Sequence, residues 1–456
     1  MTHFDLAIIG TGSGNSLVTP DFDDKRVAVI EEGLFGGTCL NVGCIPTKMF
    51  VYAAEVADTI RGSAKYGVDA TLDGVRWRDI RDRVFGRIDP IEAGGREYRE
   101  NGPNTTAYEG HAEFVGPREL RVQVGDAVET VTADQIVIAT GAHSVVPEVI
   151  SQSGVPYHTS DTVMRMDELP SSMVILGGGF IAAEFAHVFG ALGVDVSIVT
   201  RGPRMLRAED DEISAEFTAL AAQQWDVHLS AKVVGAKSSE REVALELDTG
   251  ELVAGEVLLV ATGRRPNTER LGLENAGVAT ESDGRVRVDE FGRTTVDGVW
   301  SLGDASSAYQ LKHVANHEAR VVAHNLVHPE DLRAFDHRFV PSAVFTHPQI
   351  ASVGMTEAVA RESGREITIK VQRYGDTAYG WAMEDTTGIF KVIADRQTQQ
   401  LLGAHVMGPM ASTLIQPVIQ AMSFDQTAPD VARGQYWIHP ALAEVVENAL
   451  LGLEFD

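Results

Sequence analysis

The chain is organised around residues 36 to 48, GGTCLNVGCIPTK, which contain its only two cysteines, Cys39 and Cys44. Any thiol chemistry must therefore take place in this stretch. In a regular α-helix, residues five positions apart have Cα atoms about 8 to 9 Å from one another, which exceeds the separation of about 4.4 to 6.8 Å that a disulfide tolerates. The two cysteines can form a bridge only if the backbone between them departs from an ideal helix.

The residues around the cysteines favour such a departure. Gly43 and Pro46 flank Cys44 and predict a loop that tightens into a helix start at about Ile45. A thiol at a helix start has a lowered pKa and is reactive. Closing so small a ring removes little conformational entropy from the unfolded chain, so a disulfide here would stabilise the fold only weakly. A redox-active dithiol is therefore favoured over a structural staple or two buried thiols.

Composition limits the class of protein. With 456 residues and 44% apolar content, the chain is expected to form about two to four domains. The net charge of −27 argues against nucleic acid or an anionic membrane as partner. An apolar strand at residues 4 to 9 follows Met1 without a basic region, and charged or polar residues interrupt the longest apolar run, residues 174 to 194. These features, and the absence of a cysteine framework, predict a cytoplasmic protein without a membrane span.

Residues 5 to 15, DLAIIGTGSGN, predict a strand that enters a glycine turn and then a helix. Gly10 and Gly12 occupy the first two positions of a dinucleotide-binding fingerprint, where they permit a tight turn and the close approach of a pyrophosphate. The third position, usually Gly or Ala, is an asparagine. The next strand, residues 26 to 30, leads to Glu31, whose carboxylate is placed to accept hydrogen bonds from a ribose. Together these features indicate a nucleotide site.

The same pattern occurs a second time. Residues 172 to 184, SMVILGGGFIAAE, place Gly177, Gly179 and Ala182 at the fingerprint positions, and a strand is expected at residues 194 to 199. Both units end in Ala-Thr-Gly, so the chain contains an internal repeat. Two such units imply two cofactors, or one cofactor bound at each of two sites.

The second unit differs from the first at the ribose position. Arg201, Arg204 and Arg207 follow its second strand, where the first unit has its acid. Arginine at this place fits a 2′-phosphate, so NADPH is favoured over NADH. The alternative is a solvated basic turn, which is less expected in so acidic a chain.

Three further segments complete the predicted organisation. Residues 51 to 99 have helical spacing and many charges, and Asp304 ends another apolar strand, where a carboxylate can accept a ribityl or sugar hydroxyl. Beyond residue 334 an α+β domain is expected to pack against the rest or against a second subunit. Its strands are predicted at residues 342 to 353, 366 to 371, 388 to 395 and 401 to 407.

The final helix is expected to contain His439 and Glu444. A single histidine near a chain end is usually a surface or structural residue. With a carboxylate five positions away, in a chain with a reactive dithiol, it can also form an acid–base pair in which the glutamate orients the imidazole.

Together these motifs resemble the pyridine nucleotide-disulfide oxidoreductase family over essentially the whole chain, and GGTCLNVGCIPTK is highly specific for it. The resemblance implies an α/β fold with two Rossmann-like dinucleotide-binding domains, for FAD and NADPH, and a C-terminal α+β dimerisation domain. The implied boundaries are residues 1–150 and 269–333 for FAD, 151–268 for NADPH, and 334–456 for dimerisation.

The resemblance also implies site residues. The FAD contacts would be Gly10, Gly12, Glu31, Thr38, Gly141 and Asp304. The nicotinamide cofactor would be bound by Gly177, Gly179, Ala182, Arg201 and Arg207, with Phe180 as an aromatic gate over the flavin face that receives nicotinamide. No metal is expected.

Six residues would carry the catalysis. By resemblance, Cys44 would face the flavin and Cys39 would attack the substrate. Lys48 and Glu184 match a buried ion pair near the flavin, although Thr47 occupies the alternative position of the lysine. His439 and Glu444 match a pair donated by the partner subunit.

The implied function is that of a homodimeric flavoprotein that uses NADPH to reduce a low-molecular-weight disulfide in cell redox homeostasis. Two alternatives remain open. One is a dihydrolipoamide dehydrogenase working in the opposite direction, which NAD preference and lipoamide activity would reveal. The other is a redox-sensing flavoprotein without catalysis, which would turn over no disulfide.

Overall fold

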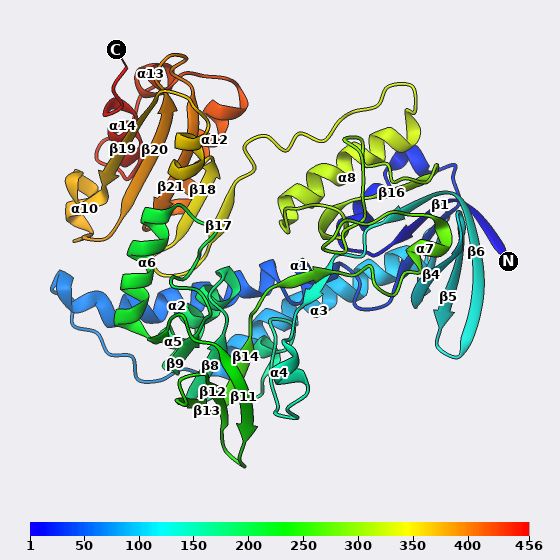
Figure 1. Cartoon of the computed structure of the whole chain (residues 1–456), viewed down its shortest axis with the longest axis horizontal. Helices are drawn as coiled ribbons and strands as arrows, with labels where there is room; N and C mark the ends of the chain where they lie inside the picture. Colours follow the sequence, from blue (N-terminus) through cyan, green and yellow to red (C-terminus); the bar gives the residue numbers. More distant parts are fainter. Residues whose placement is uncertain (456) are drawn as a thin grey trace.

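The structure is a computed structural model that describes residues 1–455. It has three main parts (Figure 1): a sheet near the N-terminus, a second sheet with its helices in the middle of the chain, and a separate C-terminal sheet covered by helices. Among residues 1–455, no helix has the length and apolar content needed to cross a bilayer.

The first sheet is parallel through most of its width. Its strands are β1 (Thr2–Ile9), β2 (Val27–Glu31), β3 (Thr105–Glu109), β6 (Ala127–Ile138) and β16 (Val299–Ser301). They pair in the order β3-β2-β1-β6-β16, and every one of these pairings is parallel. The apolar strands predicted around the first glycine turn therefore lie side by side, with their carboxyl ends at one edge.

The prediction of an α-helix after the first glycine turn is wrong. A four-residue 3₁₀ turn, η1 (Gly14–Leu17), takes its place. Pro20 follows soon after and prevents continuation, because proline disfavours α-helical conformation in the residue before it. Asn15 faces α3 (Trp77–Glu100), where Arg99 donates to its side-chain oxygen at 2.7 Å and to its carbonyl at 2.8 Å.

An antiparallel meander extends the first sheet. The N-terminal half of β6 pairs with β5 (Glu119–Val124), which pairs with β4 (His111–Gly116). One long strand thus belongs to both the parallel and the antiparallel part.

The second nucleotide unit is built in the same way. It contains β8 (Ser172–Leu176), β9 (Asp195–Val199), β10 (Asp226–His228) and β14 (Val257–Val260), paired in parallel in the order β10-β9-β8-β14. The helix α5 (Phe180–Ala191) begins directly after its glycine turn, as predicted. A small antiparallel sheet completes the unit, with β11 (Val233–Ser238), β12 (Val243–Leu247) and β13 (Leu252–Gly255).

A two-stranded ribbon connects the units. β7 (Ala142–Ser144) follows the first sheet and pairs antiparallel with β15 (Arg264–Pro266), which follows the second. The chain then returns to the first sheet through β16. The predicted domain boundaries stay a prediction, because strand pairing does not mark where a domain ends.

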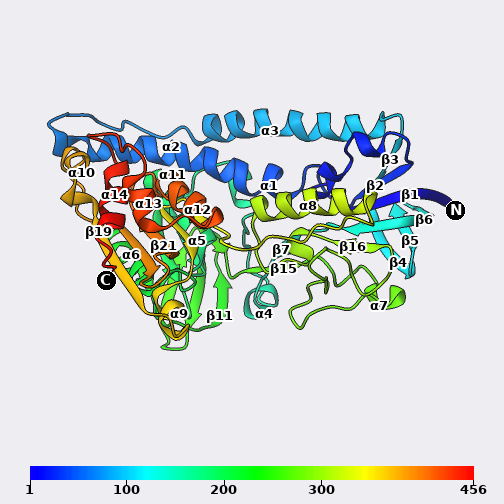
Figure 2. The same ribbon diagram turned by 90° about the horizontal axis from the view of Figure 1, so that it is seen from above.

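Two long helices lie along one side of the molecule (Figure 2): α2 (Cys44–Gly62) and α3. Aromatic rings fill the space between them and α5. The ring centroids of Phe50 and Trp77 are 5.1 Å apart, and those of Trp77 and Phe189 are 5.6 Å apart. This packing fixes the start of α2, which carries Cys44, against the second nucleotide unit.

The C-terminal sheet is antiparallel. Its order is β17-β18-β21-β20-β19, formed by β17 (Ser342–Val344), β18 (Ile350–Gly354), β19 (Ile367–Arg373), β20 (Ile389–Asp395) and β21 (Leu401–Met407). The prediction of a single strand at residues 342 to 353 is wrong, because two antiparallel strands form there. Pro348 lies in the turn between them and has no backbone N–H to donate to a strand ladder.

Helices pack against this sheet near the C-terminus, among them α12 (Gln416–Ser423), α13 (Ala428–Arg433) and α14 (Ala443–Leu451). The prediction that the last helix contains His439 is wrong. Glu444 lies in α14, but His439 precedes it by four residues, since Pro440 disfavours helical backbone at the residue before it.

Candidate active site

The cysteine stretch forms two helices joined by a tight turn. Cys39 lies in α1 (Gly37–Asn41), and Cys44 is the first residue of α2. Gly36 and Gly37 both have positive φ, at 91° and 69°, so the backbone that leads into Cys39 has a conformation that favours glycine. A side chain at Gly43 would place its first carbon 2.8 Å from the carbonyl oxygen of Thr38. The backbone between the cysteines thus departs from a single helix as expected, and α2 begins one residue before the predicted start.

Both cysteines are free thiols in this structure, and they differ in acidity. A hydrogen bond from the thiol of Cys39 lowers the pKa of Cys44 to about 7, against the effect of burial and with help from the charge of Lys48. The same hydrogen bond, together with burial, raises the pKa of Cys39 far above its usual range. In the reduced protein the first proton is therefore lost from Cys44, and Cys39 needs a base to become a nucleophile.

The reduced protein is expected to gain thiolate absorbance in the ultraviolet as the pH rises through about 7. The pKa of Cys44 is lowered, so the thiolate is complete above this value and is lost as the pH falls below it. The measurement is the difference in absorbance between the wild-type protein and a Cys44→Ser variant at each pH. In a Lys48→Met variant the midpoint should move upward. A wild-type midpoint near about 8.5, the value of an ordinary cysteine, would contradict this assignment.

Lys48 and Glu184 form the predicted ion pair. The ammonium group lies 2.7 Å and 2.8 Å from the two carboxylate oxygens of Glu184, whose residue is 4% exposed. The backbone N–H of Phe345 also donates to this carboxylate at 3.0 Å, and the Lys48 ammonium lies 4.5 Å from the centroid of the Phe345 ring. The pair joins α2 to α5 one turn from Cys44.

A cavity of about 390 Å³ lies beside the cysteines. Its walls come from the first glycine turn, the cysteine stretch, the start of α5 and the segment after β16. All the residues predicted to contact FAD line it, together with four of the predicted catalytic residues and the predicted gate: Gly10, Gly12, Glu31, Thr38, Gly141 and Asp304, then Cys39, Cys44, Lys48, Glu184 and Phe180.

One of these acids, Glu31, is held in place by hydrogen bonds from the chain itself. Glu31 accepts from the backbone N–H and the hydroxyl of Thr11, at 2.8 Å and 2.6 Å, and from the backbone N–H of Gly33 at 2.9 Å. Asp304 also lines the cavity, where burial raises its pKa and the charge of Arg264 partly offsets that effect. The carboxylate of Glu31 is thus fixed at the cavity wall.

Sequence reasoning missed two cations of this cavity, Arg264 and Lys312. Lys312 donates to the hydroxyl of Ser13 at 2.9 Å, and its charge acts on Cys39. The side chain of Arg264 is 9% exposed and donates to the carbonyl of Ala142. Arg264 follows the second Ala-Thr-Gly directly, so extending that motif by one residue would have found it. Lys312 had no local signal.

The second glycine turn has the shape that a nucleotide site needs. A side chain at Gly177, whose φ is 145°, would meet the carbonyl oxygen of Ala261 at 2.2 Å. Gly179 directly precedes the first residue of α5, and no heavy atom lies within 4 Å of the position that a Cβ would take there. Ala182 is buried on the same helix. Phe180 is 45% exposed and also lines the main cavity, so it lies between the two nucleotide units.

The three arginines after β9 are not equivalent. Arg204 is engaged: its guanidinium lies 2.6 Å from the carboxylate of Asp211. Arg201 and Arg207 are exposed, and neither makes a hydrogen bond or ion pair with another group of residues 1–455. Of these three arginines, Arg201 and Arg207 therefore have guanidinium groups that no group of residues 1–455 engages and that can bind an anion.

His439 and Glu444 lie together but away from the cysteines. The imidazole Nδ1 is 2.7 Å from a carboxylate oxygen of Glu444, a contact that lowers the pKa of the carboxyl group. The His439 side chain is 70% exposed, and neither residue lines the main cavity. In Figure 1 the adjacent α14 lies in the C-terminal part, far from α1. Within one chain the pair and the dithiol are not brought together.

Comparison with known proteins identifies the family of the chain. Residues 4–319 match the family described as pyridine nucleotide-disulphide oxidoreductase, and residues 340–450 match the dimerisation domain of that family. The chain belongs to the pyridine nucleotide-disulfide oxidoreductases, which confirms the family and the fold class expected from the sequence.

Among its relatives, the mycothione reductase of Mycobacterium tuberculosis is 58% identical over 463 residues, which cover 99% of this chain and 100% of that protein. The dihydrolipoyl dehydrogenase of Corynebacterium glutamicum is 35% identical over 470 residues, with 99% and 98% covered. Among solved structures, the HOCl-induced flavoprotein disulfide reductase RclA from Escherichia coli matches with a TM-score of 0.87 at 30% identity, covering 99% of this chain and 100% of that chain.

Proposed function

We propose that the protein is an NADPH-dependent flavoprotein that reduces mycothiol disulfide to two molecules of mycothiol. The observation that carries this proposal is the Cys39–Cys44 dithiol at a helix start inside a cavity lined by all the predicted FAD contacts. The choice of substrate rests on similarity to a mycothione reductase over the full chain, including the stretches IIGTGSGNS and YWIHPALAEVVENALLGLE.

The residues present fit FAD. A side chain at Gly10 would place its first carbon 2.3 Å from the carbonyl oxygen of Ala139, and one at Gly37 would lie 2.6 Å from the Cα of Gly12, so backbone alone forms this wall. Glu31 would bind the ribose and Asp304 a ribityl hydroxyl, with Thr38 and Gly141 as further contacts. When bound, FAD supplies a carrier that passes two electrons from NADPH to the Cys39–Cys44 disulfide, which is thereby reduced to the dithiol.

The second unit fits NADPH. Gly177, Gly179 and Ala182 would let the pyrophosphate approach the start of α5. Arg201 and Arg207 would bind the 2′-phosphate, because their guanidinium groups are exposed and unengaged within residues 1–455.

A double Arg201→Ala/Arg207→Ala variant is expected to raise the KM for NADPH by roughly tenfold to a hundredfold, with little change for NADH. The reason is the loss of two charge-assisted contacts that only the 2′-phosphate can make. Steady-state kinetics with both nucleotides provide the measurement. A Lys237→Ala/Arg241→Ala variant, which removes the same charge from exposed positions of the same unit, serves as control. An equal effect on NADPH and NADH would show that the arginines do not read the phosphate.

The thiol chemistry follows from the different pKa values of Cys39 and Cys44. The thiolate of Cys39 attacks one sulfur of the substrate, breaks the disulfide and forms a mixed disulfide while the first thiol leaves. The thiolate of Cys44 then attacks the sulfur of Cys39, releases the second thiol and closes the Cys39–Cys44 bridge. His439 would take the proton of Cys39 and give it to the leaving thiolate, and Glu444 would orient the imidazole.

His439 and Glu444 would reach the dithiol from a partner subunit. Three observations support this arrangement: the pair does not line the cavity of its own chain, residues 340–450 match the dimerisation domain, and the His439 side chain is exposed. The neighbouring Tyr436 and Ile438 are also exposed, at 102% and 75%, as expected of a segment that a second copy covers.

The proposal is tested by following NADPH oxidation by the purified yellow protein with mycothiol disulfide, glutathione disulfide and lipoamide in parallel. Selective turnover of mycothiol disulfide is the expected result. Turnover of lipoamide, above all with NADH, would instead identify a dihydrolipoamide dehydrogenase. No turnover with any disulfide would favour the redox-sensing alternative.

A further inference from the structure

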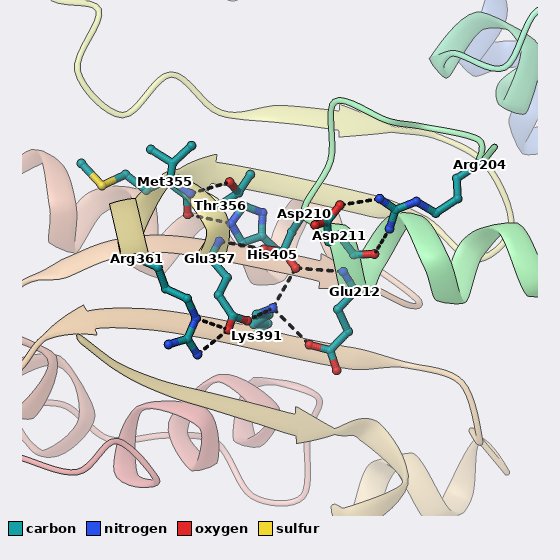
Figure 3. A network of polar contacts seen from close by, with 11 residues as sticks. Arg204, Asp210, Asp211, Glu212, Met355, Thr356, Glu357, Arg361, Lys391 and His405 are labelled. Atoms are coloured by element: carbon teal, nitrogen blue, oxygen red, sulfur yellow. Dashed lines mark hydrogen bonds and ion pairs between the residues drawn. The ribbon is translucent and has the colours of Figure 1, made fainter. Parts of the chain in front are cut away.

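A buried lysine joins the second nucleotide unit to the C-terminal sheet (Figure 3). The side chain of Lys391, on β20, is 2% exposed, and its ammonium nitrogen lies 2.8 Å from Asp210, 3.1 Å from Glu212 and 2.6 Å from Glu357. Asp210 and Glu212 belong to the start of α6 (Asp211–Gln224) in the nucleotide unit, whereas Glu357 begins α9 (Glu357–Glu362) in the C-terminal part. The ammonium group of Lys391 thus contacts two carboxylates of the nucleotide unit and one of the C-terminal part.

Asp210 is the centre of this cluster. It is 1% exposed, and its carboxylate accepts from the backbone N–H of Glu212 at 3.2 Å and from the backbone N–H of Glu357 at 2.9 Å. It thereby caps α6 while it receives two donors, Lys391 and Glu357, from the other side. Burial disfavours the charge on Lys391, but hydrogen bonds to Asp210 and Glu357 outweigh this and raise its pKa. A buried carboxylate so dependent on donors from the C-terminal part fixes how the two parts meet.

Asp210 directly follows the segment that carries the free arginines. This segment, residues 200 to 209, is called here the arginine segment. Its middle is bound to the glycine turn, because the backbone N–H of Leu206 donates to the carbonyl of Gly178 at 2.7 Å. It is also bound to the C-terminal sheet, because Ser352 donates to Glu209 at 2.8 Å. The segment is therefore held between the nucleotide turn and the Lys391 cluster, with Arg207 three residues from Asp210.

We propose that Lys391 is a positioning residue for NADPH: by holding Asp210 it fixes the arginine segment so that Arg201 and Arg207 meet the 2′-phosphate. This inference rests on the proposed function. The two arginines are exposed and have no protein partner within residues 1–455, so their placement depends on the backbone that carries them. A backbone fixed before binding leaves less freedom to be lost when the phosphate binds. The C-terminal part thereby contributes to the choice of nucleotide without touching it.

The test measures nucleotide binding to the holoenzyme, without turnover. Adenosine 2′,5′-bisphosphate and 5′-AMP serve as probes, because they differ only in the 2′-phosphate. In Lys391→Met, affinity for the bisphosphate is expected to fall by roughly tenfold, while affinity for 5′-AMP stays within about twofold of the wild-type value. Asp210→Asn should have the same effect with less risk to folding, because asparagine caps a helix as well as aspartate does.

Arg365→Met is the matched control. It breaks an ion pair of 2.9 Å with Asp395, at the end of the same strand β20, but it lies within the C-terminal part and does not reach the arginine segment. Its affinity for both probes should equal that of the wild-type protein. Thermal unfolding of all variants shows which of them are folded at the temperature of the measurement.

The possible outcomes separate the two proposals. If folded Lys391→Met and Asp210→Asn bind the bisphosphate as the wild-type protein does, while Arg201→Ala/Arg207→Ala does not, the positioning role is overturned and the NADPH assignment stands. Equal losses for both probes would also overturn it, since they indicate a general effect on the nucleotide unit. If the arginine variant keeps full affinity for the bisphosphate, the proposed reading of the 2′-phosphate fails, and the positioning role fails with it.

Discussion

Replacing Cys39 by alanine is expected to abolish disulfide reduction, with a loss of at least about 10⁴-fold, while NADPH still bleaches the yellow colour of the protein. The chain has only two cysteines, so no third thiol can attack the substrate. Cys44, Lys48 and Glu184 remain in place beside the cavity, and the side of the site that receives electrons is unchanged. Steady-state NADPH oxidation and an anaerobic absorbance spectrum measure the two effects.

Cys44→Ala is the matched variant, and it should fail at a different step. It retains Cys39, which can form the mixed disulfide but cannot be released from it. Mass spectrometry should therefore find half of the substrate attached to Cys39 in this variant and none attached in Cys39→Ala. Loss of bleaching in Cys39→Ala would contradict the division of roles between the two cysteines, as would labelling of Cys44 in that variant.

His439→Gln is expected to lower turnover by about 10² to 10⁴-fold. The thiol of Cys39 holds its proton strongly because it donates to Cys44, so its activation depends on an external base. Glu444→Gln should cost less, about tenfold to a hundredfold, since it only orients the imidazole through the 2.7 Å contact. The measurement is kcat with the disulfide substrate. Equal activity of His439→Gln and wild type would remove the histidine from the mechanism.

Mixed dimers test whether His439 acts across subunits. A dimer of one Cys39→Ala chain and one His439→Gln chain contains a single intact site if each site takes its histidine from the partner. It contains none if each chain supplies its own histidine. Two differently tagged chains, refolded or coexpressed and purified through both tags, should thus recover about half of the wild-type turnover. An inactive mixed dimer would place the histidine in the same chain as its cysteines.

Local signals in the sequence were sufficient for the nucleotide units. Gly10 and Gly177 mark places where a side chain would collide with backbone, and the apolar strands before them have the length of buried strands. Both follow from a few neighbouring residues, so they can be recognised without knowledge of the fold. The ion pair of Lys48 and Glu184 was reached by resemblance, because the two residues are 136 positions apart.

The features that were missed depend on contacts between distant segments. The 3₁₀ turn at Gly14–Leu17 is held by Arg99, which lies 84 positions further along the chain and donates to Asn15. Lys312 enters the cavity only because its helix packs beside the first glycine turn. Lys391 and Asp210 are separated by 181 positions, and nothing around either residue predicts that they meet. Such placement is decided by tertiary packing, which no local pattern encodes.

The return of β16 to the first sheet also sets an order of events during synthesis. Residues 136 to 138 of β6 must wait for residues 299 to 301 before this parallel pairing can form, and the whole second nucleotide unit is translated in between. On the ribosome the first sheet is therefore begun before the second nucleotide unit and finished after it, with part of its hydrogen-bonding edge open in the meantime. A nascent chain stalled before residue 299 would expose that edge to neighbouring chains, so completion of the cofactor site coincides with protection against aggregation.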